Sequence, residues 1–414
     1  MKEKKYVDFT DAIQEGLKTA KAIEKFEKIP LEQCLGRVLF KDIQCIKNVP
    51  PYNNSAMDGF AFNADDNGNK LIIKGVVFAG DATSYKIVAG EAYKIMTGAK
   101  IPKGADTIIP IEDVVSFDNS HIQLPSNTPR GNHYRSIGED YKLESLIFKK
   151  GQKIDATMVS LLACQGISVV DVYAKLNIAV LSTGSELREP WESSNEDEIY
   201  NSNSSGIISI LKEYNLNANY IGVVPDNLED TIAFFDTLKS YDLIISTGGV
   251  SVGDADFVAQ AFVENGLETI FHGVNVKPGR PTMMGVMGKT FVMAMPGNPL
   301  TALINTYLLA MPIITKLGGG IEHYHDFIYA KNTQAFKLKH GRVNIVLGVL
   351  KNGEFQAINK NKYGSGMFNP VINSNSALMT TADIDHIREN QMVKIIPFDF
   401  KLREHSSNVF NETK

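Results

Sequence analysis

Apolar and polar positions follow two alternating patterns between residues 175 and 318. Short apolar runs of strand length are each followed by a segment whose apolar residues recur at helical spacing. Strands are predicted at residues 177–187 (with a polar turn), 218–224, 242–246, 268–276 and 291–294, and helices at 202–214, 228–238, 257–262 and 300–315. Strands that alternate with helices of this length predict a doubly wound, parallel α/β domain with right-handed crossovers.

Different patterns flank this α/β domain on both sides. Residues 8–26, with Asp8 or Thr10 as N-cap, and residues 155–164 show helical spacing. Short β-like runs broken by glycine and proline lie between them, which predicts a mostly β domain inserted into one helical region. Further alternating runs after a glycine linker predict a C-terminal β-barrel-like domain. The predicted parts are a helical region (1–48 and 141–174), an inserted β domain (49–140), an α/β domain (175–318), a C-terminal β domain (321–402) and a polar tail (403–414).

Composition narrows the class of protein. A net charge of −5 argues against sequence-independent nucleic-acid binding, which relies on a basic surface. The N-terminus shows no secretory-signal pattern, and we expect no run that approaches the length of a membrane span. Cys34, Cys45 and Cys164 lack metal-ligand or redox spacing and are expected to be buried free thiols in a reducing compartment. We therefore expect a soluble, cytoplasmic protein with no membrane and no nucleic-acid partner.

The turn after the strand at 242–246 combines two kinds of ligand chemistry. Thr247, Gly248, Gly249 and Ser251 form a glycine-rich turn before a helix, and backbone N–H groups at such a place suit an anion. Asp256, directly after the turn, suits a cation instead. Together they indicate a bound metal ion and an oxyanion.

The carboxyl ends of parallel strands meet at one edge of a sheet, and ligands bind there. Five predicted turns should share this edge, at residues 183–186, 225–226, 247–256, 277–280 and 296–299. They carry three acids and two bases: Glu186, Asp226, Asp256, Lys277 and Arg280. The carboxylates suit Mg²⁺, and the turn N–H groups with the two bases suit a phosphate or another tetrahedral oxyanion. These loops contain no Ser–His pair and no cysteine, so metal-assisted transfer of a phosphorylated ligand is favoured over covalent catalysis.

Other signals have plainer explanations from the residues alone. Asp58 is more readily explained as a turn-capping aspartate than as a ligand, and Arg135 with Glu139 and Asp140 as an exposed loop salt bridge. Residues 288–290 resemble the end of a P-loop, but the first glycine of that motif is absent, since Met283 stands at its position. We therefore predict a hairpin turn at 288–290. No dinucleotide fingerprint follows a predicted strand.

The motifs taken together resemble a known family. They are Ser55–Ala61 (SAMDGFA), Ile95–Ala99 (IMTGA), Gly138–Asp140 (GED), Leu181–Leu187 (LSTGSEL), Ser246–Gly253 (STGGVSVG), Lys277–Gly279 (KPG) and Met295–Pro299 (MPGNP). In this set and order the sequence resembles the molybdopterin molybdenumtransferases of the bacterial MoeA type, which are related to the E domain of gephyrin. The resemblance covers nearly the whole chain.

The resemblance implies an activity and an assembly. The activity is the Mg²⁺-dependent insertion of molybdate into adenylylated molybdopterin, with release of AMP. The assembly is a homodimer, held through the helical region, in which the inserted β domain of one subunit completes the site of the other. The adenylyltransferase of the same pathway and the recipient molybdoenzymes are implied as further partners.

The resemblance also implies roles for individual residues. Glu186, Asp226 and Asp256 correspond to acidic metal-binding positions, Lys277 to a basic catalytic position and Ser365 to a serine of the C-terminal loop. Residues implied to come across the dimer are Asp58, Thr97, Arg135 and Asp140. The remaining ligand-binding residues are expected to be Thr183, Gly184, Thr247, Gly248, Gly249, Ser251, Arg280, Pro296 and Pro299.

Two positions depart from the family pattern. Asn201 stands where the family usually has aspartate, and Gly273 stands near a position that is basic in many members. We hypothesise that Arg280 replaces the missing positive charge. A gephyrin-like binding scaffold and a Mg²⁺-dependent nucleotidyl transferase, such as the molybdopterin adenylyltransferase, remain alternative functions.

Overall fold

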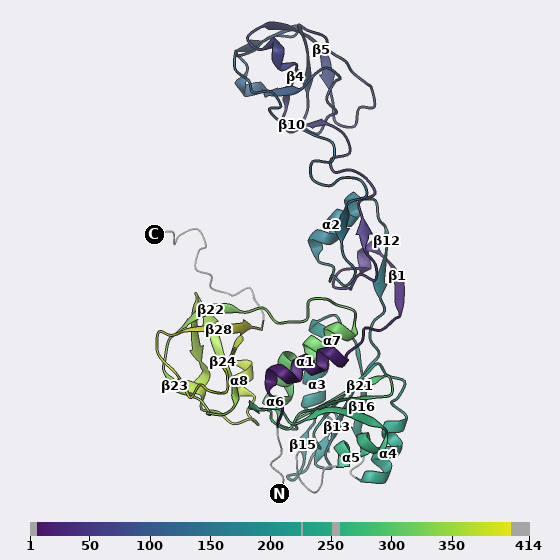
Figure 1. Cartoon of the computed structure of the whole chain (residues 1–414), viewed down its shortest axis with the longest axis vertical. Helices are drawn as coiled ribbons and strands as arrows, with labels where there is room; N and C mark the ends of the chain where they lie inside the picture. The colour runs from purple at the N-terminus through teal and green to yellow at the C-terminus, as the bar shows by residue number, and fades with distance from the viewer. Residues whose placement is uncertain (1–5, 225–226, 251–256, 399–414) are drawn as a thin grey trace. The chain divides into compact units, whose positions relative to one another are not determined.

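The computed structural model describes residues 6–224, 227–250 and 257–398. The chain forms two compact units, a larger one (residues 1–40, 151–155 and 169–414) and a smaller one (41–150 and 156–168). The larger unit holds the α/β domain and the C-terminal domain (Figure 1). The smaller unit holds the inserted β domain.

A six-stranded sheet forms the centre of the larger unit. Its strands, in spatial order, are β16 (Ala218–Val224), β13 (Ile178–Thr183), β17 (Leu243–Thr247), β21 (Thr290–Met295), β20 (Met283–Met287) and β18 (Leu267–His272). The first four strands are parallel, whereas β20 and β18 run antiparallel to their neighbours. The predicted α/β domain is confirmed, but one edge of its sheet is antiparallel because β20 returns through a hairpin turn at Gly288 and Lys289.

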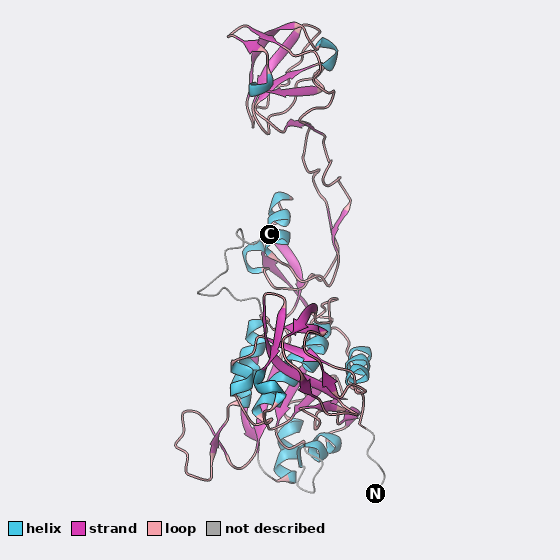
Figure 2. Ribbon diagram, turned by 90° about the vertical axis from the view of Figure 1, so that its left-hand side faces the viewer, coloured by secondary structure: helices cyan, strands magenta, loops and turns pink. Residues whose placement is uncertain are grey.

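Helices cover both faces of this sheet (Figures 1 and 2). They are α1 (Phe9–Thr19), α3 (Asn203–Glu213), α6 (Pro299–Asn305) and α7 (Met311–Leu317) on one face, and α4 (Leu228–Asp236) and α5 (Phe257–Glu264) on the other. Alternate residues of β13 separate into the two cores, with Ile178 and Val180 in the first and Ala179 and Leu181 in the second. Because each central strand is buried on both faces, it reads as an unbroken apolar run.

The helical stretch Pro299–Leu317 corrects one expectation from the sequence. It joins α6 to α7 through a π-helical turn at Thr306–Ala310, and it is long and apolar enough to cross a membrane. It packs instead within the core of the α/β domain, where 78% of its most apolar window is buried. Its length therefore serves packing against the sheet.

The N-terminal helix is shorter than predicted. Asp8 caps α1 by accepting the N–H of Thr10 at 3.1 Å, and the helix ends at Thr19. The following residues enter strand β1 (Phe26–Pro30), which pairs with β12 (Val169–Tyr173). Residues 20–25, between α1 and β1, are irregular, and the Ile23 N–H donates to the Leu317 carbonyl at 3.0 Å instead of continuing the helix.

The C-terminal domain is a closed five-strand barrel. Its strands are β24 (Val343–Lys351), β25 (Glu354–Ala357), β22 (Ile328–Asn332), β28 (Met392–Pro397) and β26 (Ser376–Met379), and pairing of β26 with β24 closes the ring. The short strand β19 (Val276–Lys277) of the α/β domain pairs with β24 in parallel. This pairing brings the loop after residue 277 beside the barrel.

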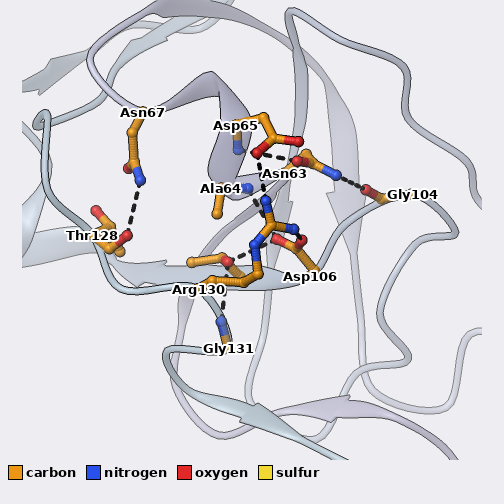
Figure 3. A network of polar contacts seen from close by, with 10 residues as sticks. Asn63, Ala64, Asp65, Asn67, Gly104, Asp106, Thr128, Arg130 and Gly131 are labelled. Carbon is orange, nitrogen blue, oxygen red and sulfur yellow. Dashed lines mark hydrogen bonds and ion pairs between the residues drawn. The ribbon is translucent and has the colours of Figure 1, made fainter.

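The smaller unit contains a second six-stranded sheet. Its strands, in spatial order, are β7 (Thr107–Pro110), β4 (Gly59–Phe62), β6 (Glu91–Ile95), β5 (Lys70–Val77), β9 (His121–Gln123) and β8 (Ser116–Phe117). Helix α2 (Ala156–Cys164) and the pair β2 (Ile43–Gln44) and β11 (Leu146–Phe148) belong to the same unit. Cys164 is exposed at the end of α2, so the expectation of a buried thiol is wrong for it, whereas Cys34 and Cys45 are buried. Arg130 forms ion pairs with Asp65 and Asp106, and the Asp106 carboxylate also accepts the N–H of Ala64 at 2.9 Å (Figure 3). This network ties together three segments of the chain, at residues 64–65, 106 and 130, near the β4 and β7 strands.

Candidate functional site

A cavity of 580 Å³ opens at the carboxyl ends of β13, β17 and β21. This is the edge at which the sequence predicted a ligand site. The predicted residues that line this cavity are Thr183, Gly184, Glu186, Thr247, Gly248, Gly249, Pro296 and Pro299. The structure therefore brings the turns after three strands together around one space. We call it the sheet-edge cavity.

The turn after β17 is packed too tightly for side chains. Gly248 and Gly249 have φ angles of +90° and +61°. A Cβ on Gly248 would lie 2.5 Å from the carbonyl oxygen of Thr183, and one on Gly249 would lie 2.4 Å from Val258. Glycine is required at both positions, and the turn backbone thereby approaches the cavity without side chains in between.

Asn203, at the start of α3, joins two of these turns through its side-chain amide. Its Nδ2 donates to the Thr247 hydroxyl at 2.9 Å and to the Gly297 carbonyl at 2.7 Å. The Thr247 hydroxyl in turn donates to the Pro296 carbonyl at 3.2 Å. The Asn203 Oδ1 is buried without a hydrogen-bond partner in the described structure, so an acceptor is left beside the cavity.

Asn201, the first departure from the family pattern, lies in a buried polar chain in the wall of the cavity. Its Oδ1 accepts the Ser182 hydroxyl at 2.9 Å, and its Nδ2 donates to the Tyr220 hydroxyl at 2.8 Å. Tyr220 donates its own hydrogen to Glu189, and burial together with this bond raises the pKa of Tyr220. The Tyr220 oxygen therefore needs a donor from position 201, which an amide provides and an ionised aspartate does not.

The predicted metal ligands are only partly covered by the described structure. Glu186 is exposed and is the only acid among the described residues that line the sheet-edge cavity. Asp226, Asp256 and Ser251 lie outside the described residues. No group of three His, Cys, Asp or Glu side chains with metal-binding geometry occurs within the described ranges. One carboxylate with water and ligand phosphates is a usual Mg²⁺ environment, so Glu186 fits such an ion.

A second cavity of 320 Å³ lies between the α/β domain and the barrel. It adjoins the first, since Pro281, Pro296 and Asn298 line both. Its polar lining includes the predicted residues Lys277, Arg280 and Ser365, with Tyr363 of the same glycine-rich loop as Ser365, and three that the sequence did not indicate: Arg342, Asn344 and Asn361. None of its described lining residues is acidic. We call it the cationic cavity.

The polar groups of the cationic cavity come from distant parts of the chain. Asn298, the N-cap residue of α6, donates from Nδ2 to the Ser365 hydroxyl at 3.0 Å. Arg342 comes from the barrel, directly before β24. Burial and the neighbouring Arg280 guanidinium lower the pKa of Arg342. A positive cavity in a chain of net charge −5 is suited to an oxyanion.

The residues predicted to act across a dimer lie in the smaller unit. The Asp58 carboxylate accepts the backbone N–H of Thr97 at 2.6 Å and its hydroxyl at 2.7 Å, and these bonds lower the pKa of Asp58. The Asp58 carboxylate therefore caps the turn at residues 96–99, which lies in another part of the chain. Arg135 and Asp140 are both exposed, and no ion pair joins them in the described structure.

Family models match three consecutive parts of the chain. Residues 7–166 match the MoeA N-terminal region (domain I and II), and residues 179–316 match the probable molybdopterin binding domain. Residues 329–398 match the MoeA C-terminal region (domain IV). These matches confirm the resemblance seen in the sequence motifs.

Curated proteins and solved structures give the same result. The molybdopterin molybdenumtransferase of Haemophilus influenzae is 32% identical over 91% of this chain and 95% of its own length. That of Synechococcus elongatus is 33% identical over 70% of this chain and 74% of its own length. The Dictyostelium discoideum gephyrin is 30% identical over 71% of this chain and 47% of its own length. A crystal structure of the Pyrococcus horikoshii OT3 molybdopterin biosynthesis moeA protein has a TM-score of 0.82 at 27% identity, covering 95% of this chain and all of that one.

Proposed function

Because the chain belongs to the MoeA family of molybdopterin molybdenumtransferases, transferases of molybdenum cofactor biosynthesis, we propose that it inserts molybdate into adenylylated molybdopterin and releases AMP. The observation that carries this proposal is the adjacency of two cavities with different chemistry. One is bordered by glycine-rich turns, and the other is cationic and lacks a described acid. A phosphorylated organic substrate and an inorganic oxyanion would then meet at the shared wall, next to Pro296 and Asn298.

The cationic cavity is the proposed molybdate site. Molybdate is a tetrahedral dianion, and Lys277, Arg280 and Arg342 supply three cationic groups around this space. Guanidinium groups donate two N–H bonds to one oxyanion in a fixed geometry, while lysine acts as a point charge. The Ser365 hydroxyl, held by Asn298, is placed to donate a further hydrogen bond. These residues would bind and orient the oxyanion.

The sheet-edge cavity is the proposed site of adenylylated molybdopterin. Backbone N–H groups of Gly249, of Val250 and of the start of α3 suit its phosphate oxygens, whereas the Gly248 N–H already donates to the Met295 carbonyl. The unpartnered Oδ1 of Asn203 suits an N–H or O–H donor of the same substrate. Its volume of 580 Å³ falls within the usual range of about 300–1,000 Å³ for sites of organic ligands.

We include Mg²⁺ in the proposal. Glu186 would bind it together with Asp226 and Asp256, which lie outside the described residues. When bound, the ion would neutralise charge on the phosphate oxygens as AMP departs. The residues of the chain itself orient the two substrates. No serine or cysteine in the described lining is paired with a histidine, which fits direct transfer without a covalent enzyme intermediate.

A second copy of the chain is proposed to complete the site. Asp58 and Thr97 are exposed and already joined by two hydrogen bonds, so their geometry exists before any partner binds. Arg135 and Asp140 would accompany them from the same inserted domain. Cytoplasmic location, transfer of the substrate from the adenylyltransferase and delivery of the product to molybdoenzymes belong to the same proposal.

The test is AMP release from purified protein supplied with adenylylated molybdopterin, Mg²⁺ and increasing molybdate. We expect release to saturate with molybdate and Lys277→Ala to raise the half-saturating concentration at least about tenfold, the loss of one charged contact. Lys289→Ala removes the same charge from an exposed hairpin outside both cavities and should change nothing. AMP release that does not depend on molybdate would refute the proposal, ATP consumption would favour an adenylyltransferase, and a stable partner without turnover would favour a scaffold.

A further inference from the structure

The N-terminal residues Tyr6 and Val7 lie against the segment that leads into the cationic cavity. Val7 forms a parallel bridge with Val274, donating its N–H to the Gly273 carbonyl at 3.1 Å. Its own carbonyl accepts the N–H of Asn275 at 2.7 Å. These two backbone bonds fix the position of the preceding residue, Tyr6.

Gly273, the second departure from the family pattern, makes room for the Tyr6 ring. A Cβ at this position would lie 2.5 Å from Cδ1 and 2.7 Å from Cε1 of Tyr6. The φ angle of +102° is also one that residues with a side chain rarely adopt. Any side chain at 273 would therefore displace the ring, so Tyr6 and Gly273 depend on each other.

The Tyr6 ring also carries the guanidinium of Arg280. The guanidinium carbon lies 4.2 Å from the ring centroid, within the range of a cation–π contact. The Arg280 Nε is buried and has no hydrogen-bond partner, and no carboxylate of the described residues pairs with this side chain. Among the described groups, the ring is therefore the attractive contact that holds the guanidinium.

A restraint of this kind is needed because the neighbouring charges repel. Arg280 shares its cavity with Lys277 and Arg342 and with no described acid. A free arginine side chain would turn away from two like charges toward water. The electron-rich face of an aromatic ring offsets part of this repulsion and limits the side chain to one plane.

We propose that Tyr6 is a positioning residue of the oxyanion site, that it acts by holding the Arg280 guanidinium in the cationic cavity, and that Gly273 is the position that admits its ring. The ligand class is a tetrahedral oxyanion, for which the preorganised guanidinium lowers the cost of binding. This inference rests on the proposed function of the cationic cavity.

The test compares Tyr6→Leu, which removes the ring, with Tyr6→Phe, which keeps it. Tyr6→Leu should raise the KM for molybdate about 5- to 30-fold, as expected for loss of a partly desolvated cation–π contact. The kcat and the KM for adenylylated molybdopterin should stay within about twofold of the wild-type values. Tyr6→Phe should behave as the wild type. Tyr6→Met is the second variant without a ring, should the leucine variant fold poorly by circular dichroism.

A double-mutant cycle separates positioning from a general structural role. Because Tyr6 acts through Arg280, Tyr6→Leu in an Arg280→Ala background should raise the KM for molybdate no further than Arg280→Ala alone. An equal additional loss in that background would overturn the inference, as would a wild-type molybdate KM in both ring-free variants. If Lys277→Ala also left the molybdate KM unchanged, the proposed function of the cavity would fail. If Lys277→Ala weakened molybdate binding while the ring-free variants did not, only the role of Tyr6 would fail.

Discussion

Replacing Asn201 by aspartate, the residue that the family usually has there, should destabilise this chain. The side chain is 2% exposed, and the change keeps its shape while exchanging an amide for a carboxyl group. Two consequences follow from the contacts of Nδ2. The Tyr220 oxygen loses its donor at 2.8 Å, and a second carboxylate oxygen comes to lie about as close to Glu189 as Nδ2 does now, at 3.4 Å.

The magnitude follows from these two contacts. An unsatisfied buried polar atom costs about 1–3 kcal/mol. Two carboxylates at the present 3.4 Å separation would repel by about 5 kcal/mol at an effective dielectric constant of about 20, and solvent around the half-buried Glu189 reduces this value. The new carboxyl group avoids much of the repulsion by binding a proton. We therefore expect a loss of about 2–4 kcal/mol at pH 8.

The loss should depend on pH in one direction. Burial and Glu189 both raise the pKa of an aspartate at this position above its unfolded value, so the folded state retains the proton longer. Between the two pKa values the folded state therefore binds more protons than the unfolded state. The stability of the variant falls as pH rises through that window. At pH 5, a protonated carboxyl group can donate to Tyr220, and the deficit should be smaller.

Hydrogen exchange measures this effect without assuming that the two units unfold together. Amides of β13 and β16 should exchange about 30- to 1,000-fold faster in Asn201→Asp than in the wild type at pH 8, while amides of the smaller unit serve as the internal control. Asn219→Asp makes the same chemical change at an exposed position of β16, where the hydrogen bond from Nδ2 to the Asn177 Oδ1 is also exposed, and should have little effect. Unchanged exchange in Asn201→Asp, or a deficit that shrinks as pH rises, would refute the reasoning.

Three further predictions concern the site. Gly249→Ala should lower kcat/KM for adenylylated molybdopterin at least about tenfold, because its Cβ overlaps Val258. Gly266→Ala is the control: its φ is +87° and nothing lies within 4 Å, so it should cost stability and leave KM unchanged. If Gly249→Ala and the wild type had equal KM values, the tight turn would be excluded as a binding element. Asp58→Ala should lose turnover while the protein stays dimeric in light scattering, and an active variant would remove this carboxylate from the mechanism. The hydrogen bonds to Asp58 lower its pKa, so ionisation of Asp58 should cause no change in activity with pH above pH 5. A pH dependence in that range that disappears in Asp58→Ala would contradict the lowered pKa.

The sequence alone determined the parts of this protein that depend on neighbouring residues. Apolar runs placed β16 at its observed residues, 218–224, and β13, β17 and β21 close to theirs, because a strand buried on both faces has a local signature. The rule for parallel strands then brought the turns at 183–186, 247–250 and 296–299 to one edge. The hairpin turn at 288–290 was predicted, but strand β20 before it was not, and its antiparallel direction follows from pairing with β21.

Only the tertiary structure showed which residues meet from distant parts of the chain. Arg342 reaches the cationic cavity because β24 of the barrel pairs with β19 of the α/β domain. Tyr6 reaches Arg280 because Val7 bridges to Val274 and because Gly273 has no side chain. Periodicity records which face of its own element a residue occupies, whereas the partner across that face is chosen by packing among elements far apart in sequence. The turns of the sheet-edge cavity could thus be predicted one by one, but the cationic cavity beside it is a product of tertiary packing.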